Sequence, residues 1–337
     1  MLRAGRRPGR VLAIGAAVGV WLVVTVAALA ACTGPSTPPL GGDGPAAGGR
    51  ATTTTQSPFT GQPVAFDRPV LAVKVDNSPA ARPQRNLDQA DLVYVERVEG
   101  GLSRYLAVYS SRIPAEVGPV RSARESDLEL LRQFGTPALA FSGANSGVLA
   151  LVKQAPVKDV SPSVARSAYF RGSDHRAPHN LYARGSALLK AVTGVSPAGD
   201  IGFRFGDAPG GGVEKASYTV RYPAARFTFT WSAARERWLV SVDGRKATTS
   251  SGSRLAAATV VVQRTVIRQS QFHDVLGNNS PYTETVGQGK ATVLRGGQAF
   301  TGTWARGTAA GGTTFRTDAG AALTFARGQV WLLYLPA

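Results

Sequence analysis

The sequence has 337 residues, of which 43% are hydrophobic and 18% charged, and its formal net charge is +17. This length allows two ordinary domains with their own cores, and the composition excludes an intrinsically disordered chain. The positive charge is mostly arginine spread along the chain rather than gathered in dense basic blocks, so no nucleic-acid partner is expected.

Residues 1–31 have the pattern of a signal peptide. Arginines between Arg3 and Arg10 precede an apolar run over residues 11–28, and small residues then lead to Cys32, the only cysteine. This pattern resembles a bacterial lipoprotein signal, which implies cleavage before Cys32 and a lipid anchor with fatty acyl chains such as palmitate. The protein would then lie outside the cytoplasm, on the outer face of the cytoplasmic membrane. The alternative is an uncleaved transmembrane helix, because the apolar run is just long enough to cross a bilayer.

Residues 32–57 are rich in Gly, Pro, Ala, Ser and Thr and contain almost no bulky apolar side chains. Such a segment cannot bury enough surface to offset its chain entropy. We therefore expect a flexible tether between the anchor and the folded part.

The first folded segment is predicted to contain strands and one hairpin. Residues 70–75 form an apolar, β-branched run that ends at Asp76, and residues 92–98 and 104–110 are two strand-like runs joined by a glycine-containing turn. Glu96 shares an otherwise apolar face of its strand. We expect it at an exposed edge or paired with an arginine, because an unpaired buried charge is costly.

A helix is predicted in the middle of this segment. Gly118-Pro119 predicts a turn, and Ser122 with a glutamate three residues later resembles a capping box for a helix that ends at Phe134. Arg121 and Arg124 then lie beside the positive end of the helix dipole, which is unfavourable for stability alone. An anion, either a ligand or a buried carboxylate of the protein itself, would explain this placement.

Two polar loops follow this helix. Residues 143–147 connect a strand to a helix, but they lack the Gly-Lys-Ser/Thr ending of a phosphate-binding loop, so an ordinary strand-to-helix turn is expected. His175 and His179 are four residues apart, but Pro178 between them argues against a metal-binding pair on one helix. His179 and Asn180 are expected either to fix the loop that leads into the next helix or to contact a ligand.

From residue 197 onward the sequence consists of short β-rich runs separated by turns such as Asp243-Gly244 and Gly296-Gly297. This spacing predicts an antiparallel β region, in which His273 is expected to be a structural loop residue. The predicted fold class is α+β, with an α/β N-terminal domain over residues 58–196 and a smaller, mostly antiparallel β domain over residues 197–337.

Several ordered motifs resemble one known family. They are Val73-Lys74-Val75-Asp76-Asn77, Ala81-Arg82-Pro83-Gln84, residues 90–96, Glu99-Gly100-Gly101-Leu102-Ser103-Arg104, residues 118–124 and Ala177-Pro178-His179-Asn180-Leu181-Tyr182. Over most of residues 59–336 the chain is similar to the YerB-like bacterial lipoproteins. The resemblance implies a two-part protein with an α/β N-terminal region and a smaller β-rich C-terminal region. It carries over no enzymatic activity.

The first functional hypothesis is a non-enzymatic envelope protein that binds an anionic ligand, such as a cell-wall polymer, or an envelope protein through an arginine-rich cleft. Guanidinium groups match carboxylate and phosphate oxygens. The same arginines can instead pair with the protein's own carboxylates, and we expect a mixture of both roles. The candidate binding residues are Asp76, Asn77, Arg82, Glu96, Arg104, Arg121, Arg124, Arg171, His179 and Asn180.

The second hypothesis is an envelope hydrolase or transferase that acts on a cell-wall substrate. His179 would be the base and Ser122 or Ser142 the nucleophile. Alternatively, Asp76 and Glu96 would act as a carboxylate pair. No known catalytic motif supports this reading, so no catalytic residue, cofactor or metal is assigned. The hypothesis requires His179 to lie within hydrogen-bond reach of a nucleophile or a carboxylate inside a cleft.

Overall fold

The computed structural model describes residues 54–65, 68–274 and 276–337. Cys32 and the predicted signal peptide over residues 1–31 lie outside the described residues. Within the described ranges, no helix is both long and apolar enough to cross a membrane.

The predicted flexible tether, residues 32–57, includes residues that belong to the folded part of the protein. β1 (Thr54–Gln56) pairs antiparallel with β2 (Pro63–Ala65), and Ser57 N–H donates to the carbonyl of Gln62 at 2.8 Å. Phe59 is fully buried and packs edge-to-face on Phe134, with ring centroids 5.4 Å apart. The prediction is therefore wrong for residues 54–57, because the ring of Phe59 holds this turn against the core.

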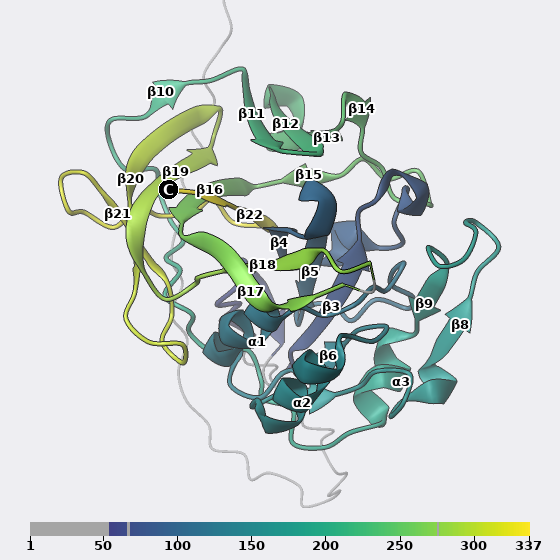
Figure 1. Cartoon of the computed structure of the whole chain (residues 1–337). Coiled ribbons are helices and arrows are strands. Elements are labelled where there is room, and N and C mark those ends of the chain that lie inside the picture. Colours follow the sequence, from purple (N-terminus) through teal and green to yellow (C-terminus); the bar gives the residue numbers. More distant parts are fainter. Residues whose placement is uncertain (1–53, 66–67, 275) are drawn as a thin grey trace, which may run out of the picture. The chain divides into compact units, whose positions relative to one another are not determined.

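A mixed sheet of eleven strands forms the centre of the described structure (Figure 1). The strand order is β10-β20-β19-β16-β22-β4-β5-β3-β6-β7, and β21 pairs with β20. These strands are β3 (Leu71–Asp76), β4 (Leu92–Arg97), β5 (Ser103–Tyr109), β6 (Ala138–Ala140), β7 (Lys158–Asp159), β10 (Val213–Glu214), β16 (Thr259–Thr265), β19 (Gly287–Arg295), β20 (Gln298–Arg306), β21 (Thr314–Thr317) and β22 (Val330–Pro336). The antiparallel β4–β5 hairpin is as predicted.

The predicted domain boundary near residue 197 does not divide this sheet. β22 lies parallel to β4 in a register that runs from Val330 opposite Leu92 to Leu333 opposite Val95, and it also lies parallel to β16. Strands from both sides of the predicted boundary therefore share one sheet.

Helices are few and short in the described structure, which consists mostly of strands. α1 (Glu125–Leu131), α2 (Ser146–Gln154) and α3 (Gly185–Lys190) all precede residue 197. The 3-10 helices are η1 (Pro79–Ala81), η2 (Leu87–Gln89), η3 (Glu99–Gly101), η4 (Arg132–Phe134), η5 (Arg166–Ala168) and η6 (Ala233–Arg235). The expected α/β character of the N-terminal part is thus not confirmed, because its sheet mixes parallel and antiparallel pairs.

A second, antiparallel sheet of five strands packs on one face of the large sheet. Its strands are β11 (Ser217–Tyr222), β12 (Ala225–Ser232), β13 (Arg237–Val242), β14 (Arg245–Lys246) and β15 (Ala256–Ala257). Aromatic side chains fill the interface. Tyr105 makes T-shaped contacts with Phe227 and Trp331, and its ring centroid lies 6.2 Å and 5.5 Å from theirs, respectively. This interface is the larger of the two hydrophobic cores.

The helices α1 and α2 contribute to the core on the opposite face. The alternation predicted for β4 is confirmed, since Val93 and Val95 belong to the first core, and Leu92 and Tyr94 to the second. Besides β1 and β2, two further antiparallel pairs of described strands lie outside the two large sheets: β8 (Tyr169–Arg171) with β9 (Leu181–Ala183), and β17 (Ile267–His273) with β18 (Asn279–Thr283).

The charged residue on the helix-covered face of β4 is buried, and its partner differs from the prediction. The carboxyl group of Glu96 contacts the ammonium of Lys74 in β3, and this ammonium also lies 2.6 Å from Oδ1 of Asp127 in α1. Lys74 and Asp127 are fully inaccessible to solvent. The prediction of an arginine partner or an exposed edge for Glu96 is therefore wrong, because Lys74 reaches it from the same face of the sheet.

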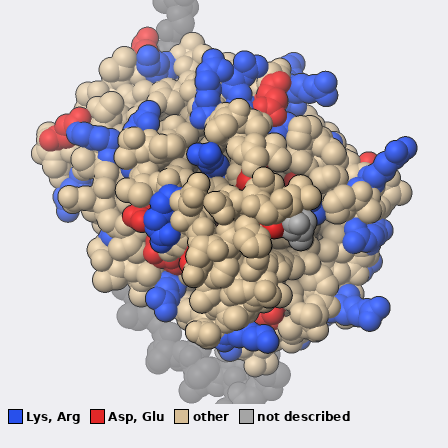
Figure 2. All heavy atoms as spheres, in the orientation of Figure 1, with Lys and Arg blue, Asp and Glu red and all other residues tan. Residues whose placement is uncertain are grey.

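The charges on the face drawn in Figure 2 are dispersed. Lysine and arginine side chains are spread over this face, with acidic side chains among them. On this face no broad basic patch is present among the described residues.

Candidate functional site

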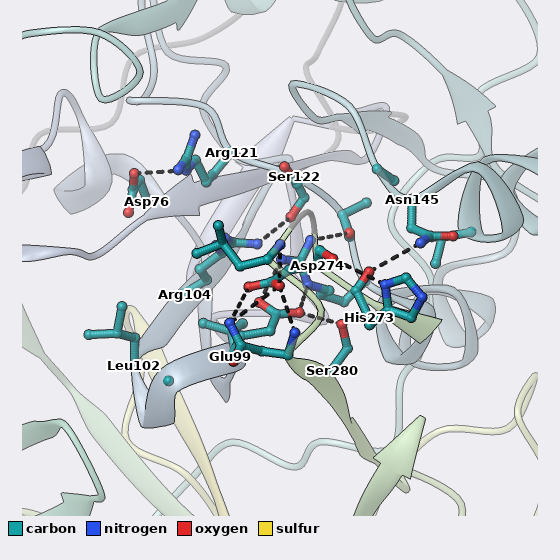
Figure 3. A pocket seen from close by; sticks show the side chains of 18 of the residues that line it. Asp76, Glu99, Leu102, Arg104, Arg121, Ser122, Asn145, His273, Asp274 and Ser280 are labelled. Atoms are coloured by element: carbon teal, nitrogen blue, oxygen red, sulfur yellow. Dashed lines mark hydrogen bonds and ion pairs between the residues drawn. The ribbon is translucent and has the colours of Figure 1, made fainter. Parts of the chain in front are cut away.

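A cleft of about 910 Å³ lies where the carboxyl end of β3 meets the amino end of β5 (Figure 3). The segment before α1, the start of α2 and the loop between β17 and β18 complete its walls. The lining residues are 76, 78, 98–100, 102–104, 121–124, 143–145, 148, 179, 273–274, 276–278 and 280. Five of the predicted site residues are among them: Asp76, Arg104, Arg121, Arg124 and His179.

Strand register brings Asp76 and Arg104 together at the base of this cleft. Arg104 of β5 lies directly opposite Asp76 of β3 on one side and Glu96 of β4 on the other. All three side chains project from the same face, because paired residues in a sheet point the same way. One row of the sheet thus carries a carboxylate, a guanidinium and a carboxyl group.

Residues 117–121, before α1, form an extended stretch that places Arg121 beside Asp76. The carbonyl of Pro119 accepts a hydrogen bond from the backbone N–H of Asp76 at 2.8 Å, and the backbone N–H of Val120 donates to the carbonyl of Leu181 at 2.6 Å, so this stretch joins β3 to β9. The turn predicted at Gly118-Pro119 is therefore wrong. Gly118 has φ +140°, and a Cβ there would lie 2.8 Å from the nitrogen of Val120, so the path requires glycine.

Asp76 is held by three groups. Its Oδ2 accepts from His179 Nδ1 at 2.8 Å and lies 3.2 Å from Arg121 Nε, while its Oδ1 accepts from Ser78 N–H at 2.9 Å. Burial alone would raise the pKa of Asp76. The hydrogen bonds from Ser78 and His179 and the charges of Arg121 and Arg104 outweigh burial and hold that pKa below its usual value. Asp76 is therefore an ionised carboxylate at neutral pH.

The helix α1 begins later than the predicted capping box. Its cap residue is Arg124, whose backbone N–H donates to Oδ2 of Asp127 at 2.7 Å. Ser122 is therefore not the cap, because Asp127 satisfies this part of the helix start from within the first turn. The predicted end at Phe134 agrees with the 3-10 turn η4, which extends α1.

Arg124 is paired with a carboxylate of the protein itself, which is one of the two explanations left open by the sequence. Its Nε lies 2.5 Å from Oε1 of Glu99 and its Nη2 lies 2.6 Å from Oε2, so the contact is bidentate. The hydroxyl of Ser280 in β18 also donates to Glu99. Burial would raise the pKa of Glu99, but Arg124 and Ser280 hold it below its usual value.

Arg104 differs from its two neighbours, because the described residues include no carboxylate within ion-pair distance of it. Its hydrogen bond goes from Nη1 to the carbonyl of Ser122 at 3.2 Å. Burial, together with the charge of Arg124, lowers the pKa of Arg104 to about 10, although Glu99 and Asp76 act in the opposite direction. The guanidinium therefore remains charged at neutral pH while it is partly removed from water.

The start of α2 and the β17–β18 loop close one side of the cleft. Oδ1 of Asn145 accepts from Gly147 N–H at 2.9 Å, and its Nδ2 donates to the carbonyl of His273 at 3.1 Å. Asp274 accepts from the backbone N–H groups of Leu276 and Asn278, both at 2.9 Å. The amino end of α2 is thus capped by the protein's own side chain, and Asp274 holds the loop in shape.

The other predicted site residues do not line the cleft. Asn77 and Arg82 form a separate cluster, in which Arg82 Nη2 donates to the Asn77 carbonyl at 2.6 Å and Nη1 contacts Asp243 at 2.7 Å. Arg171 and Asn180 bond to each other at 2.7 Å across the β8–β9 hairpin. Glu96 lies buried with Lys74. Local pairings therefore hold these five residues away from the cleft that Arg104, Arg121 and Arg124 line.

Sequence reasoning also missed several residues of the cleft. Ser78 and Glu99 follow predicted strands, and nothing in the local sequence marks either of them as a residue of a cleft. Asn145 precedes a predicted helix, and the only role that its position indicates is that of a helix cap. The β17–β18 loop reaches the cleft from more than a hundred residues away, and no local pattern indicates that. These residues are Ser78, Glu99, Asn145, His273, Asp274 and Ser280.

The described ranges contain no group of three or more His, Cys, Asp or Glu side chains arranged to hold a metal ion. His175 is bonded through Nε2 to the carbonyl of Pro83 at 3.2 Å, whereas His179 contacts Asp76. The two histidines therefore have different surroundings.

Comparison with known proteins supplies a family for the chain. Residues 55–197 match the N-terminal domain, and residues 218–332 the C-terminal domain, of a protein of unknown function designated DUF3048. A protein of Bacillus subtilis (strain 168) named "Putative lipoprotein YerB" is 34% identical over 142 residues, which is 41% of this chain and 42% of the relative. The alignment thus spans less than half of that relative's length.

A crystal structure of YerB from Bacillus subtilis has the same fold. The superposition has a TM-score of 0.70 at 23% sequence identity and covers 84% of this chain and 97% of the YerB chain. At this level of identity the likeness concerns the fold alone.

Proposed function

The chain belongs to the DUF3048 family, and we propose that it is a membrane-anchored lipoprotein of the cell envelope whose cleft binds an anionic ligand. The name of the relative YerB and the pattern before Cys32 support the lipid anchor. The arginines of the cleft support the binding role.

One observation carries the binding proposal: Arg104 is charged, partly buried and without a carboxylate partner among the described residues. A guanidinium removed from water without an anion is unfavourable, whereas an anionic ligand would replace the lost hydration with charge-assisted hydrogen bonds. The neighbouring Arg121 and Arg124 do not share this need, because Asp76 and Glu99 pair with them.

The ion pairs of the cleft suggest how much negative charge the ligand carries there. Arg121 and Arg124 are paired with Asp76 and Glu99, and the third carboxylate of the lining, Asp274, bonds to the backbone of its own loop, so Arg104 is the arginine left without a carboxylate partner among the described residues. A group with a single negative charge matches this one guanidinium. Suitable groups are a carboxylate or phosphodiester of a cell-wall polymer, or a carboxylate of another envelope protein.

The test is a thermal-melting titration of the full chain in a mild nonionic detergent with three monoanions: N-acetylalanine, glucuronate and dimethyl phosphate. At least one monoanion should raise the melting temperature of the wild type and of Arg171→Gln, but not of Arg104→Gln. Arg171 is the matched control, because it is exposed and lies outside the cleft. If no monoanion gives a shift that depends on Arg104, the binding proposal is wrong.

The anchor has a separate test. Cys32→Ala should release the chain from membranes during an alkaline wash, whereas the wild type should stay bound. A variant that remains in the membrane fraction would instead support the transmembrane helix.

A further inference from the structure

We propose that His179 and Asp76 form a general-base pair that hydrolyses a monoanionic ester held in the cleft by Arg104. The ester is either a carboxylic ester that carries one carboxylate elsewhere or a phosphodiester. This inference rests on the proposed anion-binding function, to which it adds a reaction and a substrate class.

The first support is the orientation of the imidazole. Nδ1 of His179 lies 2.8 Å from Oδ2 of Asp76 and 3.1 Å from the hydroxyl of Ser78. Because Asp76 is ionised, this network assigns the imidazole proton to Nδ1. Nε2 then carries a lone pair, and the described residues offer it no hydrogen-bond partner. Since His179 lines the cleft, this nitrogen is available to a water molecule or a ligand.

The second support is the rigidity of the carboxylate behind the imidazole. Only 4% of the Asp76 side chain is exposed, and both of its oxygens are bound, Oδ1 by Ser78 N–H and Oδ2 by His179 and Arg121. A carboxylate fixed in this way selects one tautomer and one ring orientation of the histidine, as in known hydrolytic sites. Asp76 is therefore a positioning residue, and His179 is the group that meets the substrate.

The third support is the presence of two guanidinium groups with different tasks. Arg104 would hold the anionic group of the substrate, since no carboxylate of the described residues lies within ion-pair distance of it. Arg121 uses Nε toward Asp76, and the described residues provide no partner for its two terminal nitrogens. These nitrogens can donate to the oxygen on which negative charge develops in the transition state.

The reaction balances without any further reagent. Nε2 of His179 removes a proton from water as the water oxygen bonds to the carbonyl carbon or the phosphorus. The bond from that atom to the leaving oxygen breaks, and the imidazolium returns its proton to the leaving alkoxide. The products are an acid and an alcohol, and His179 is regenerated.

The experiment measures p-nitrophenol release by the full chain in a mild nonionic detergent. The probes are mono-p-nitrophenyl glutarate, bis-p-nitrophenyl phosphate and the neutral p-nitrophenyl acetate. We expect saturable release from one of the two anionic probes, and the probe that reacts identifies the ester class. His179→Gln should lower kcat about 10²- to 10⁴-fold. Asp76→Asn should lower kcat more than it changes KM, and Arg104→Gln should mainly raise KM.

His175→Ala is the matched control, because the side chain of this histidine hydrogen-bonds to the carbonyl of Pro83 and lies outside the cleft. Its kinetics should equal those of the wild type, and a melting curve for each variant shows that it is folded. Three results overturn the proposal: no release from either anionic probe, release unaffected by His179→Gln, or a preference for the neutral ester. If the anionic probes raise the melting temperature through Arg104 but are not hydrolysed, the proposed binding function stands and this inference fails. If they neither bind nor react, both fail.

Discussion

Lys74 and Asp127 form an ion pair of 2.6 Å between β3 and α1 in which neither side chain is exposed to solvent. The second carboxylate oxygen of Asp127 accepts from the backbone N–H of Arg124, so the same residue anchors the sheet, caps the helix and fixes one wall of the cleft. The shape of the cleft therefore depends on a charge that no ligand can reach.

Lys74→Met should be strongly destabilising. It removes the cation and leaves the carboxylate of Asp127 buried without its partner, which costs about 3–5 kcal/mol in comparable buried pairs. Urea denaturation followed by circular dichroism measures the loss. Lys290→Met, which breaks an exposed pair with Asp318, should cost no more than about 1 kcal/mol. Equal losses for both variants would contradict the structural role of Lys74.

Glu96 should make stability depend on pH. Burial raises the pKa of Glu96 to about 8, with Lys74 acting against the shift and Asp127 adding to it. Between its ordinary pKa of 4.5 and about 8, the folded chain holds this proton while the unfolded chain has lost it. Its contribution to stability should therefore fall as pH rises through this window.

The check is the free energy of unfolding of wild type and Glu96→Gln at pH 5.5 and 8.5. The amide cannot ionise, so the variant should lose less stability between the two pH values than the wild type. Glu284→Gln is the control for the loss of a carboxylate, because this glutamate is half-buried and pairs with Arg268 away from Lys74. Identical slopes in all three proteins would show that Glu96 does not titrate in this range.

Gly118→Ala should distort the cleft. The added Cβ would lie 2.8 Å from the nitrogen of Val120 and 2.9 Å from the carbonyl oxygen of Leu181, at a φ that side chains rarely adopt. We expect a loss of about 1–3 kcal/mol in stability, with weaker anion binding because Arg121 shifts. Gly210→Ala, where the new methyl group meets no atom within 4 Å, should change neither quantity. If both variants behave alike in denaturation, the extended path through Gly118 is not required.

Glu99→Gln should strengthen anion binding. The change releases Arg124 from its bidentate partner and adds one unit of positive charge to the inner cleft. An additional favourable interaction of roughly 1 kcal/mol corresponds to about fivefold tighter binding of a monoanion. The same titration with Asp200→Asn, an exposed partner of Arg204, should show no gain. Weaker binding by Glu99→Gln would instead indicate that Glu99 holds the cleft open.

Local features of the fold are predictable from the sequence. The β4–β5 hairpin follows from alternating side chains around Glu99-Gly100-Gly101, and the end of the central helix follows from Gly135. The residue at which that helix starts cannot be predicted from the local sequence. Arg124 rather than Ser122 is the cap residue because Asp127 bonds to the backbone of Arg124, and Asp127 is itself held by Lys74, 53 residues earlier.

The site was predictable only in part, for the same reason. Arg104, Arg121 and Arg124 are recognisable as candidates, but whether each faces a ligand depends on carboxylates brought in by strand register and by distant loops. Arg82 and Arg171 are candidates on the same grounds, yet Asn77 and Asn180 hold them outside the cleft. No pattern in the sequence shows that the β17–β18 loop covers this particular end of the sheet.

The parallel pairing of β22 with β4 affects the order in which the parts of the protein can fold. Leu92 and Val95 of β4 lack their neighbours on that side until residues 330–333 have been synthesised. A chain that emerges from its amino end therefore leaves one edge of β4 open during most of its synthesis. The two family segments should consequently complete their structure as a single cooperative unit, with the cleft formed only after the final strand is in place.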